Sequence, residues 1–194
     1  THSPYDEPKI VRQIVDDAVE LPYRNSAKYT DYCLGKYFEA ARKEAWYEHT
    51  LFILVADHSH QTQYKRDYFT SDYQRVPMLW LGGALKDEYR GSTIDKISSH
   101  IDIAHTLLKQ LGLPCGHYVW AKDILNPYAP EYMTCEIPGG VGWTSRNGYI
   151  RYEGFTKTYP IIRDFDEQDT VTIEKEKRWA AAYLQKLYST YLDY

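Results

Sequence analysis

The stretch LFILVADH, residues 51–58, decides the fold class of this chain of 194 residues. Its first six residues are all apolar, and a run too short for a helix and apolar on both faces is typical of a strand buried inside a parallel sheet. Asp57 and His58 follow at the carboxyl end of that strand. Ligands of open α/β sheets bind beyond the carboxyl ends of the strands, so this pair is the first candidate site.

A second strand is expected over Val76–Leu81, closed by Gly82-Gly83, as a parallel neighbour or near neighbour of the first. Between the two strands lies a polar and aromatic segment, residues 59–74, without helical or strand periodicity. A loop of this length usually carries function. The sequence therefore predicts that chemistry is concentrated where the first strand ends and this loop begins.

Two helices are expected to flank the strands. The first covers Tyr29–Glu44, with Asn25 or Ser26 as its N-cap. The second starts at the capping box Ser99-x-x-Asp102 and ends at Gly112 and Pro114. The residues predicted to face the core are Tyr29, Cys33, Tyr37 and Ala41 in the first helix and Ile101, Ala104, Leu108 and Leu111 in the second.

Residues 131–194 have a different character. Aromatic and apolar residues surround the pair Asn147-Gly148, which is a strong hairpin signal, so a small antiparallel β unit is expected. A terminal helix is predicted over Thr172–Tyr194, with Ala180, Leu184, Leu187 and Tyr191 on its buried stripe. The fold class is therefore α/β: a layered sheet with helices on both faces over residues 1–130, then the antiparallel unit and terminal helix over residues 131–194.

Composition excludes several classes of protein. Twenty-three basic and 27 acidic residues give a net charge of −4 with no Lys/Arg block, so no nucleic-acid partner is expected. The longest apolar run, residues 51–56, is far shorter than the ~20 residues of a transmembrane helix. Three cysteines without a CxxC pair indicate no disulfide framework or zinc knuckle, although a single Cys115–Cys135 bridge stays open.

The Asp57-His58 pair has two interpretations. A carboxylate oxygen beside an imidazole nitrogen suits a divalent ion such as Zn or Mn, provided that the chain leaves strand geometry there so that both side chains reach one point. Alternatively, Asp57 caps a following turn and His58 bonds to the backbone. His60 is a candidate third ligand or substrate contact, but a solvated loop histidine is the favoured interpretation.

An ordered set of motifs resembles a known family. The segments THSPY (1–5), LFILVADHS (51–59), QRVPM (74–78) and SHIDIAHTLL (99–108) follow one another in this order. Together with the first helix they resemble the C-terminal part of sulfatase-like proteins of the alkaline phosphatase superfamily, above all phosphoglycerol transferases of the lipoteichoic acid synthase type. The resemblance extends over about residues 1–155, and it implies an alkaline phosphatase-like fold.

The resemblance also implies a site for phosphoryl or sulfuryl transfer, with one divalent metal ion (Mn, Zn, Mg or Ca) beside a Ser, Thr or formylglycine nucleophile. Asp57 and His58 match the family's Asp-His pair of metal ligands. His2 matches the histidine that contacts the transferred group or the leaving oxygen. The family's nucleophile and first acidic ligand lie upstream of these motifs, so no nucleophile is assigned here and metal binding by this chain is expected to be weak or absent.

The expected function is therefore that of a fragment of a metal-dependent phosphoglycerol transferase or sulfatase-like hydrolase that acts on phosphate or sulfate esters. The chain opens at Thr1 without an initiator methionine, and we expect an extracytoplasmic parent protein anchored in the membrane by segments outside this chain. His105 departs from the family, which usually has proline there. The alternative function is a non-enzymatic, tyrosine-rich module that binds glycans or an envelope partner, with Asp57 and His58 in structural roles.

Overall fold

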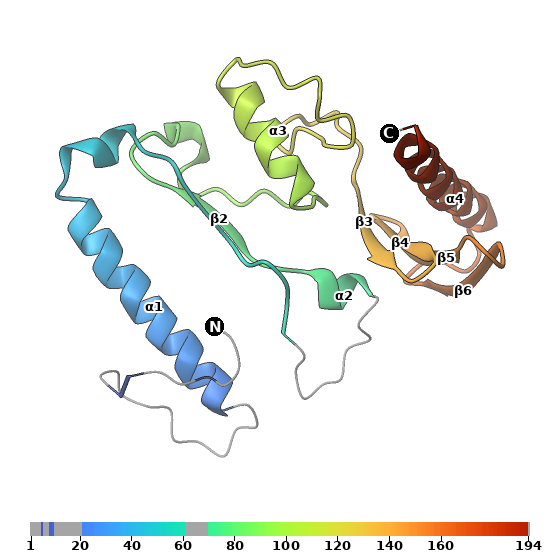
Figure 1. Cartoon of the computed structure of the whole chain (residues 1–194), viewed down its shortest axis with the longest axis horizontal. Coiled ribbons are helices and arrows are strands. Elements are labelled where there is room, and N and C mark those ends of the chain that lie inside the picture. The colour runs from blue at the N-terminus through green and yellow to red at the C-terminus, as the bar shows by residue number, and fades with distance from the viewer. Residues whose placement is uncertain (1–4, 6–7, 10–20, 61–69, 194) are drawn as a thin grey trace. The chain divides into compact units, whose positions relative to one another are not determined.

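The structure is a computed structural model and describes residues 5, 8–9, 21–60 and 70–193. The chain forms two compact units, residues 1–66 with 75–92 and residues 67–74 with 93–194 (Figure 1). The elements in chain order are α1 (Leu21–Ala41), η1 (Ala45–His49), β1 (Phe52–Val55), α2 (Ser71–Gln74), β2 (Met78–Leu81), η2 (Asp87–Tyr89), α3 (Ile101–Gln110), β3 (Tyr132–Ile137), β4 (Gly140–Ser145), β5 (Gly148–Glu153), β6 (Thr158–Arg163) and α4 (Thr170–Leu192). The expected domain boundary between residues 130 and 131 stays a prediction.

The first unit is organised around the ring of Phe52 at the start of β1. The ring of Phe38 on α1 packs edge-on against it, with 5.1 Å between centroids, and Tyr47 of η1 lies 5.8 Å away. Tyr37 and Trp46 complete the cluster. Edge-to-face aromatic pairs at these distances are favourable beyond the area that they bury, so this cluster holds α1 and η1 against the strand.

The two strands of the first unit pair antiparallel, and the expectation of parallel neighbours is wrong. In their register Phe52 lies opposite Leu81 and Val55 lies opposite Met78. The expected burial of this strand is also not met, because none of the four residues of β1 is fully buried and Val55 is exposed. The apolar run carries no information on the direction of the neighbouring strand, and among the described residues β1 pairs only with β2. The chain between β1 and β2 returns at the same end, so the segment before Pro77 comes back beside Ala56, whose N–H donates to the carbonyl of Pro77.

The first helix begins earlier and presents a different face than predicted. It starts at Leu21, so Asn25 and Ser26 are buried within it and neither is its N-cap. Phe38 and Ala41 are buried, whereas Cys33 and Tyr37 of the predicted stripe are exposed. Tyr37 still contacts Phe52 through the edge of its ring despite being 50% exposed. The spacing identified a helix, but the neighbour that selects its buried face is the β1 strand.

In the second unit, α3 is capped at both ends as the sequence predicts. The N–H of Ser99 donates to Oδ2 of Asp102 at 2.9 Å, which is one half of a capping box. At the other end, the N–H groups of Gly112 and Leu113 donate to the carbonyls of Lys109 and Leu108, which is a Schellman motif. Gly112 has a φ of 67°, the left-handed conformation that this motif requires.

The buried face of α3 is polar, contrary to the predicted apolar stripe. Asp102 and Thr106 are almost fully buried, whereas Ile101 and Leu111 are exposed. Oδ1 of Asp102 accepts from the backbone N–H of Lys122 at 2.7 Å, and the hydroxyl of Thr106 accepts from the N–H of Ile124 at 2.9 Å. These side chains satisfy the backbone of a distant loop, a role that helical periodicity does not reveal.

The ammonium group of Lys122 is buried beside the same carboxylate. It lies 3.0 Å from Oδ2 of Asp102 and donates to the carbonyl of Tyr132 at 2.8 Å. It also lies 4.3 Å from the centre of the Tyr132 ring, close enough for a cation–π contact. The ion pair therefore joins α3, the loop at residue 122 and the first strand of the sheet.

The predicted antiparallel unit is confirmed and has four strands in the order β3-β4-β5-β6. In the hairpin at Asn147-Gly148, Ser145 pairs with Gly148, so Arg146 and Asn147 form the turn. A side chain at Gly148 would meet the ring of Phe165 and the carbonyl of Arg163. The glycine is therefore required by close packing as well as by the turn.

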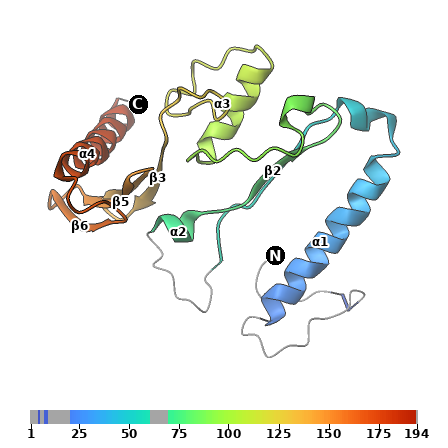
Figure 2. The same ribbon diagram turned by 180° about the vertical axis from the view of Figure 1, so that it is seen from behind.

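The terminal helix α4 lies against this sheet in both ribbon views (Figures 1 and 2). Asp169 is its N-cap, and its carboxylate accepts from the N–H of Thr172. Ala180 and Leu184 are buried as predicted, but Leu187 and Tyr191 of the same predicted stripe are exposed. The core that they join consists of Val141, Trp143 and Ile150 from the sheet with Ala180 and Leu184 from the helix.

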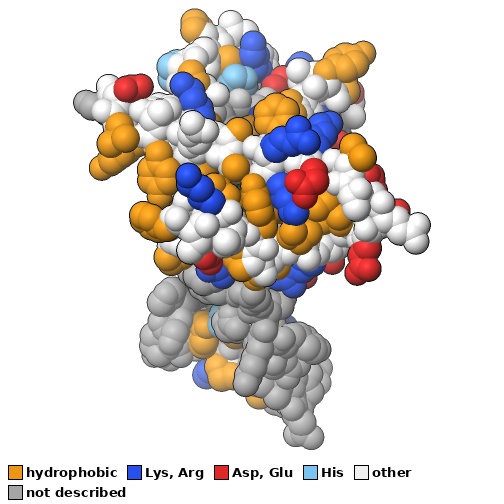
Figure 3. Space-filling view, turned by 90° about the vertical axis from the view of Figure 1, so that its right-hand side faces the viewer, with side chains coloured by type: hydrophobic (Ala, Val, Ile, Leu, Met, Phe, Trp, Pro, Cys, Tyr) orange, Lys and Arg blue, Asp and Glu red, His pale blue; other side chains and the backbone are white. Residues whose placement is uncertain are grey.

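On the face shown in Figure 3, Lys and Arg side chains are interspersed with acidic and hydrophobic ones and form no continuous basic surface. The possible disulfide is absent, since Cys115 and Cys135 are both free thiols. Among the described residues, no helix combines the length and the apolar character that crossing a membrane requires.

Candidate functional site

Asp57 and His58 lie directly beyond β1, where the chain leaves the strand. The backbone bends at both residues, which removes the alternation that would send their side chains to opposite faces. Both side chains are solvent-exposed, 88% for Asp57 and 66% for His58. A shared site requires that the chain leave strand geometry at this pair, and the structure shows that it does.

One polar atom of each side chain forms a hydrogen bond with a backbone group. Oδ1 of Asp57 accepts from the N–H of His58 at 2.9 Å. Nδ1 of His58 lies 2.8 Å from the carbonyl oxygen of Ser59, and since a carbonyl only accepts, Nδ1 carries the proton and donates. The neutral ring then has its lone pair on Nε2. The remaining atoms, Oδ2 of Asp57 and Nε2 of His58, lie 3.5 Å apart.

This donor set fits a divalent cation. Two ligands that bind one ion at about 2.1 Å with a tetrahedral angle between them lie about 3.4 Å apart. A metal-binding histidine characteristically donates its other ring N–H to a carbonyl or carboxylate, as His58 does to Ser59. Both atoms are open to solvent, so an ion can reach them without displacing other side chains.

The charge of Asp57 is stabilised by the chain itself. The hydrogen bond from the N–H of His58 lowers the pKa of the Asp57 carboxyl below its ordinary value of 3.8, partly opposed by desolvation. The carboxylate is therefore ionised throughout the neutral range, as a metal ligand must be.

Within the described ranges, no group of three or more His, Cys, Asp or Glu side chains is arranged to hold a metal ion. The pair thus contributes at most two protein ligands from this part of the chain. His2 lies outside the described residues, so its assigned role stays a prediction.

His60 is part of an aromatic cluster rather than a solvated loop side chain. Its ring stacks on Tyr23 of α1, with 4.1 Å between centroids and 12° between planes. The ring of Tyr5 meets it edge-on at 5.9 Å, and the Tyr5 hydroxyl lies 3.3 Å from Nδ1 of His60. Tyr5 and Tyr23 also contact each other, with centroids 5.8 Å apart. The three residues, which we call the Tyr-His cluster, are each partly buried.

Sequence reasoning missed Tyr5 and Tyr23 as partners of this histidine. Tyr5 is separated from His60 by 55 positions, and Tyr23 lies in the first turn of a helix that was predicted to begin later. The abundance of tyrosine, 20 residues, was the one available signal, and it does not indicate which tyrosines meet.

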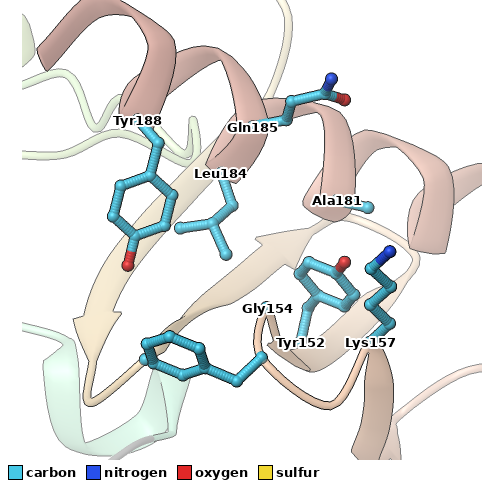
Figure 4. A pocket seen from close by; sticks show the side chains of 9 residues that line it. Tyr152, Gly154, Lys157, Ala181, Leu184, Gln185 and Tyr188 are labelled. Carbon is cyan, nitrogen blue, oxygen red and sulfur yellow. The ribbon is translucent and has the colours of Figure 1, made fainter. Parts of the chain in front are cut away.

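The second unit contains a surface pocket of about 590 Å³ between the β5–β6 turn and α4 (Figure 4). Leu184 and the rings of Tyr152, Phe155 and Tyr188 line it, with Lys157 at one side. Its lining includes no carboxylate, histidine or cysteine. The pocket therefore offers no carboxylate, imidazole or thiolate ligand for a metal ion, and the candidate site remains at Asp57 and His58.

Comparisons with known proteins show which family this chain resembles. The family model described as Sulfatase matches residues 2–113, which include His2, Asp57 and His58. Lipoteichoic acid synthase 2 of Bacillus subtilis (strain 168) is 26% identical over 124 residues, which cover 57% of this chain and 18% of that protein. The resemblance inferred from the ordered motifs is confirmed.

The fold is similar to that of a crystal structure described as a protein in the alkaline phosphatase superfamily from Vibrio parahaemolyticus. The TM-score is 0.69 at 23% identity, covering 97% of this chain and 47% of that one. This likeness confirms the predicted fold class. The chain spans about half the length of that solved structure and less than a fifth of the synthase.

Proposed function

Because this chain belongs to the sulfatase family, whose enzymes act on phosphate and sulfate esters, we propose that it is the C-terminal part of a metal-dependent phosphoglycerol transferase or sulfatase-like hydrolase. The similarity to a lipoteichoic acid synthase supports the phosphoglycerol branch. The observation that carries the proposal is the geometry of Asp57 and His58. One polar atom of each side chain is hydrogen-bonded to the backbone. The other two, Oδ2 of Asp57 and Nε2 of His58, remain available and lie 3.5 Å apart.

Asp57 and His58 would hold the divalent ion (Mn, Zn, Mg or Ca) that the family implies. When bound, such an ion supplies positive charge that lowers the pKa of a nucleophile and neutralises the non-bridging oxygens of the ester. Asp57 contributes a full negative charge, and His58 contributes a neutral nitrogen whose orientation the Ser59 carbonyl holds. The nucleophile and the remaining ligands belong to segments upstream of this chain.

His2 would contact the group in transfer, or protonate the leaving oxygen. Supporting this role, Tyr5 follows His2 by three positions and contacts His60, which follows Asp57 by three positions. Tyr5, which is near His2 in the sequence, is therefore in contact with a residue of the loop that carries the metal pair. The parent protein would act outside the cytoplasm, anchored in the membrane by segments outside this chain.

The test uses the full-length parent protein with Mn²⁺, Zn²⁺, Mg²⁺ or Ca²⁺ in turn, assayed on bis(p-nitrophenyl) phosphate, p-nitrophenyl phosphate and p-nitrophenyl sulfate. Asp57→Ala should abolish turnover and reduce metal content, measured by elemental analysis, while the circular dichroism spectrum is unchanged. Asp57→Asn keeps the acceptor for the His58 N–H and removes only the charge, so it should also lose the metal. His2→Ala should lower kcat by ~10²–10⁴ and leave metal content intact.

Two results would contradict the proposal. One is an Asp57→Ala protein that keeps both its metal and its full activity. The other is a parent protein that turns over none of the three esters in the presence of any of the four ions. Either result would favour the tyrosine-rich binding module, in which the pair has a structural role.

A further inference from the structure

The Tyr-His cluster fixes the orientation of an imidazole two positions after His58. Tyr23 covers one face of the His60 ring, and Tyr5 approaches its edge with the hydroxyl 3.3 Å from Nδ1. Stacking and an edge contact together restrict rotation of the ring about both of its side-chain torsions. A solvated loop histidine would have neither restraint.

The contact with Tyr5 also selects the tautomer of His60. A phenol O–H is a stronger acid than the N–H of a neutral imidazole, and an imidazole nitrogen is a stronger base than a phenol oxygen. The favoured arrangement therefore has the Tyr5 hydroxyl donating to Nδ1, so that the ring proton of His60 is on Nε2. Among the described residues, Nε2 of His60 has no hydrogen-bond partner.

The position of His60 along the chain keeps it close to the metal pair. His60 follows His58 by two positions, so their Cα atoms lie at most about 7 Å apart. The imidazole side chain can bridge a distance of this size to a group bound at Oδ2 of Asp57 and Nε2 of His58. His60 is not required as a metal ligand in this arrangement, because its Nδ1 is used by Tyr5 and its Nε2 carries a proton.

We propose that His60 is a substrate-binding residue that donates a hydrogen bond from Nε2 to an anionic oxygen of the ester, with Tyr5 and Tyr23 as its positioning residues. This inference rests on the proposed function and adds to it a specific contact with the transferred phosphoryl or sulfuryl group. Hydrogen bonds from a fixed neutral donor to a charged oxygen are among the stronger ones in proteins.

The amide variants of His60 separate a donor role from a structural role. In His60→Gln the side-chain amide nitrogen takes the place of Nε2, whereas in His60→Asn the amide oxygen takes the place of Nδ1 and can still accept from Tyr5. A donor at Nε2 predicts that Gln retains much of the activity of the full-length protein on bis(p-nitrophenyl) phosphate. It also predicts that Asn loses about 10- to 100-fold in kcat/KM with unchanged metal content.

Tyr5→Phe keeps the ring and removes only the hydroxyl, so it should lower kcat/KM by a smaller factor than His60→Asn. His49→Asn is the matched control, since His49 is an exposed histidine in the same unit, and it should leave activity unchanged. The inference is overturned if His60→Asn is as active as the wild type, or if Gln and Asn are equally impaired.

Nuclear magnetic resonance of the 194-residue chain tests the inference without turnover. At pH 8, ¹⁵N shifts of the imidazole nitrogens should show the proton of His60 on Nε2, and Tyr5→Phe should reduce this preference. Inorganic phosphate added to the full-length parent protein in the presence of saturating Mg²⁺ should shift the Nε2 resonance of His60. A proton on Nδ1, or a His60 resonance unmoved by phosphate, refutes the inference. Absence of ester turnover by the wild-type parent instead refutes the proposed function, and the phosphate titration still decides the role of His60.

Discussion

The indole N–H of Trp143 donates a hydrogen bond of 2.7 Å to Oε2 of Glu176, which joins β4 to α4 inside the second unit. The other carboxylate oxygen accepts from Nδ2 of Asn147 in the β4–β5 turn, also at 2.7 Å. Glu176 is 7% exposed. One buried carboxylate on the helix therefore binds both a central strand and the hairpin turn beside it.

Replacing Glu176 should destabilise this unit even when the shape is kept. In Glu176→Gln one side-chain atom becomes an NH₂ donor that must face either the Trp143 N–H or the Asn147 NH₂, which leaves a buried donor unpaired. We expect a loss of about 1–3 kcal/mol in the free energy of unfolding, measured with urea. Glu174→Gln, an exposed change on the same helix, should cost less than about 0.5 kcal/mol. Equal effects of the two variants would contradict the role of Glu176.

Two glycine positions should respond to alanine with opposite signs. A Cβ at Gly83 would overlap the backbone at Glu48, so Gly83→Ala should destabilise the first unit by about 1–3 kcal/mol. A Cβ at Gly35, within α1, meets no atom within 4 Å. Gly35→Ala should therefore stabilise the protein by about 0.5–1 kcal/mol through the higher helix propensity of alanine. Thermal unfolding of both variants measures whether each change raises or lowers stability. A Gly83→Ala protein as stable as the wild type would contradict the close packing of Gly83 against the backbone at Glu48.

Stability should fall at alkaline pH because of Cys135. Burial raises the pKa of its thiol above the ordinary value of 9.0, partly opposed by a hydrogen bond from Gly142. Above pH 9 the unfolded state loses this proton while the folded state retains it. The free energy of unfolding then decreases with rising pH until the folded thiol also ionises, by up to about 1.4 kcal/mol per pH unit. Cys135→Ala should reduce this slope, and an unchanged slope in that variant would contradict the role of this thiol.

This chain by itself should bind divalent metal weakly. Asp57 and His58 provide two protein ligands, and an ion held by two ligands stays mostly hydrated. Elemental analysis after dialysis should therefore find well under one equivalent of Mn or Zn. A stoichiometric ion that resists a chelator would show that the ligand set is complete within the 194 residues.

Much of the candidate site could be predicted from the sequence. An apolar run that ends in Asp57-His58 marks the end of a strand, and adjacent oxygen and nitrogen donors at such a position indicate a metal. The structure adds that Oδ1 of Asp57 and Nδ1 of His58 are hydrogen-bonded to the backbone, so that Oδ2 and Nε2 are the atoms that remain available to an ion. That selection depends on the bend after β1, and the sequence does not specify the bend.

Predictions of the buried faces were less successful. The predicted stripe of α3 was Ile101, Ala104, Leu108 and Leu111, yet the buried residues of the helix are Asp102 and Thr106. Periodicity assumes that apolar side chains face the core. Here the loop at Lys122 needs acceptors for its backbone N–H groups, and burying them unpaired would cost more than exposing two aliphatic side chains.

The sequence by itself determined the features that depend on neighbours in the chain. These are the strand before Asp57, the capping box at Ser99, the turn before Gly148 and the order of motifs that marks the family. The strand, the capping box and the turn rest on interactions within a few residues, and the motif order is read directly along the chain, so residue types and spacing are sufficient. Only the tertiary structure decided the antiparallel pairing of β1 with β2, the stacking of Tyr23 on His60 and the edge-on contact of Tyr5 with the same ring. These contacts join residues tens of positions apart, and their partners are selected by packing and by hydrogen-bond satisfaction across the whole unit, which no local pattern encodes.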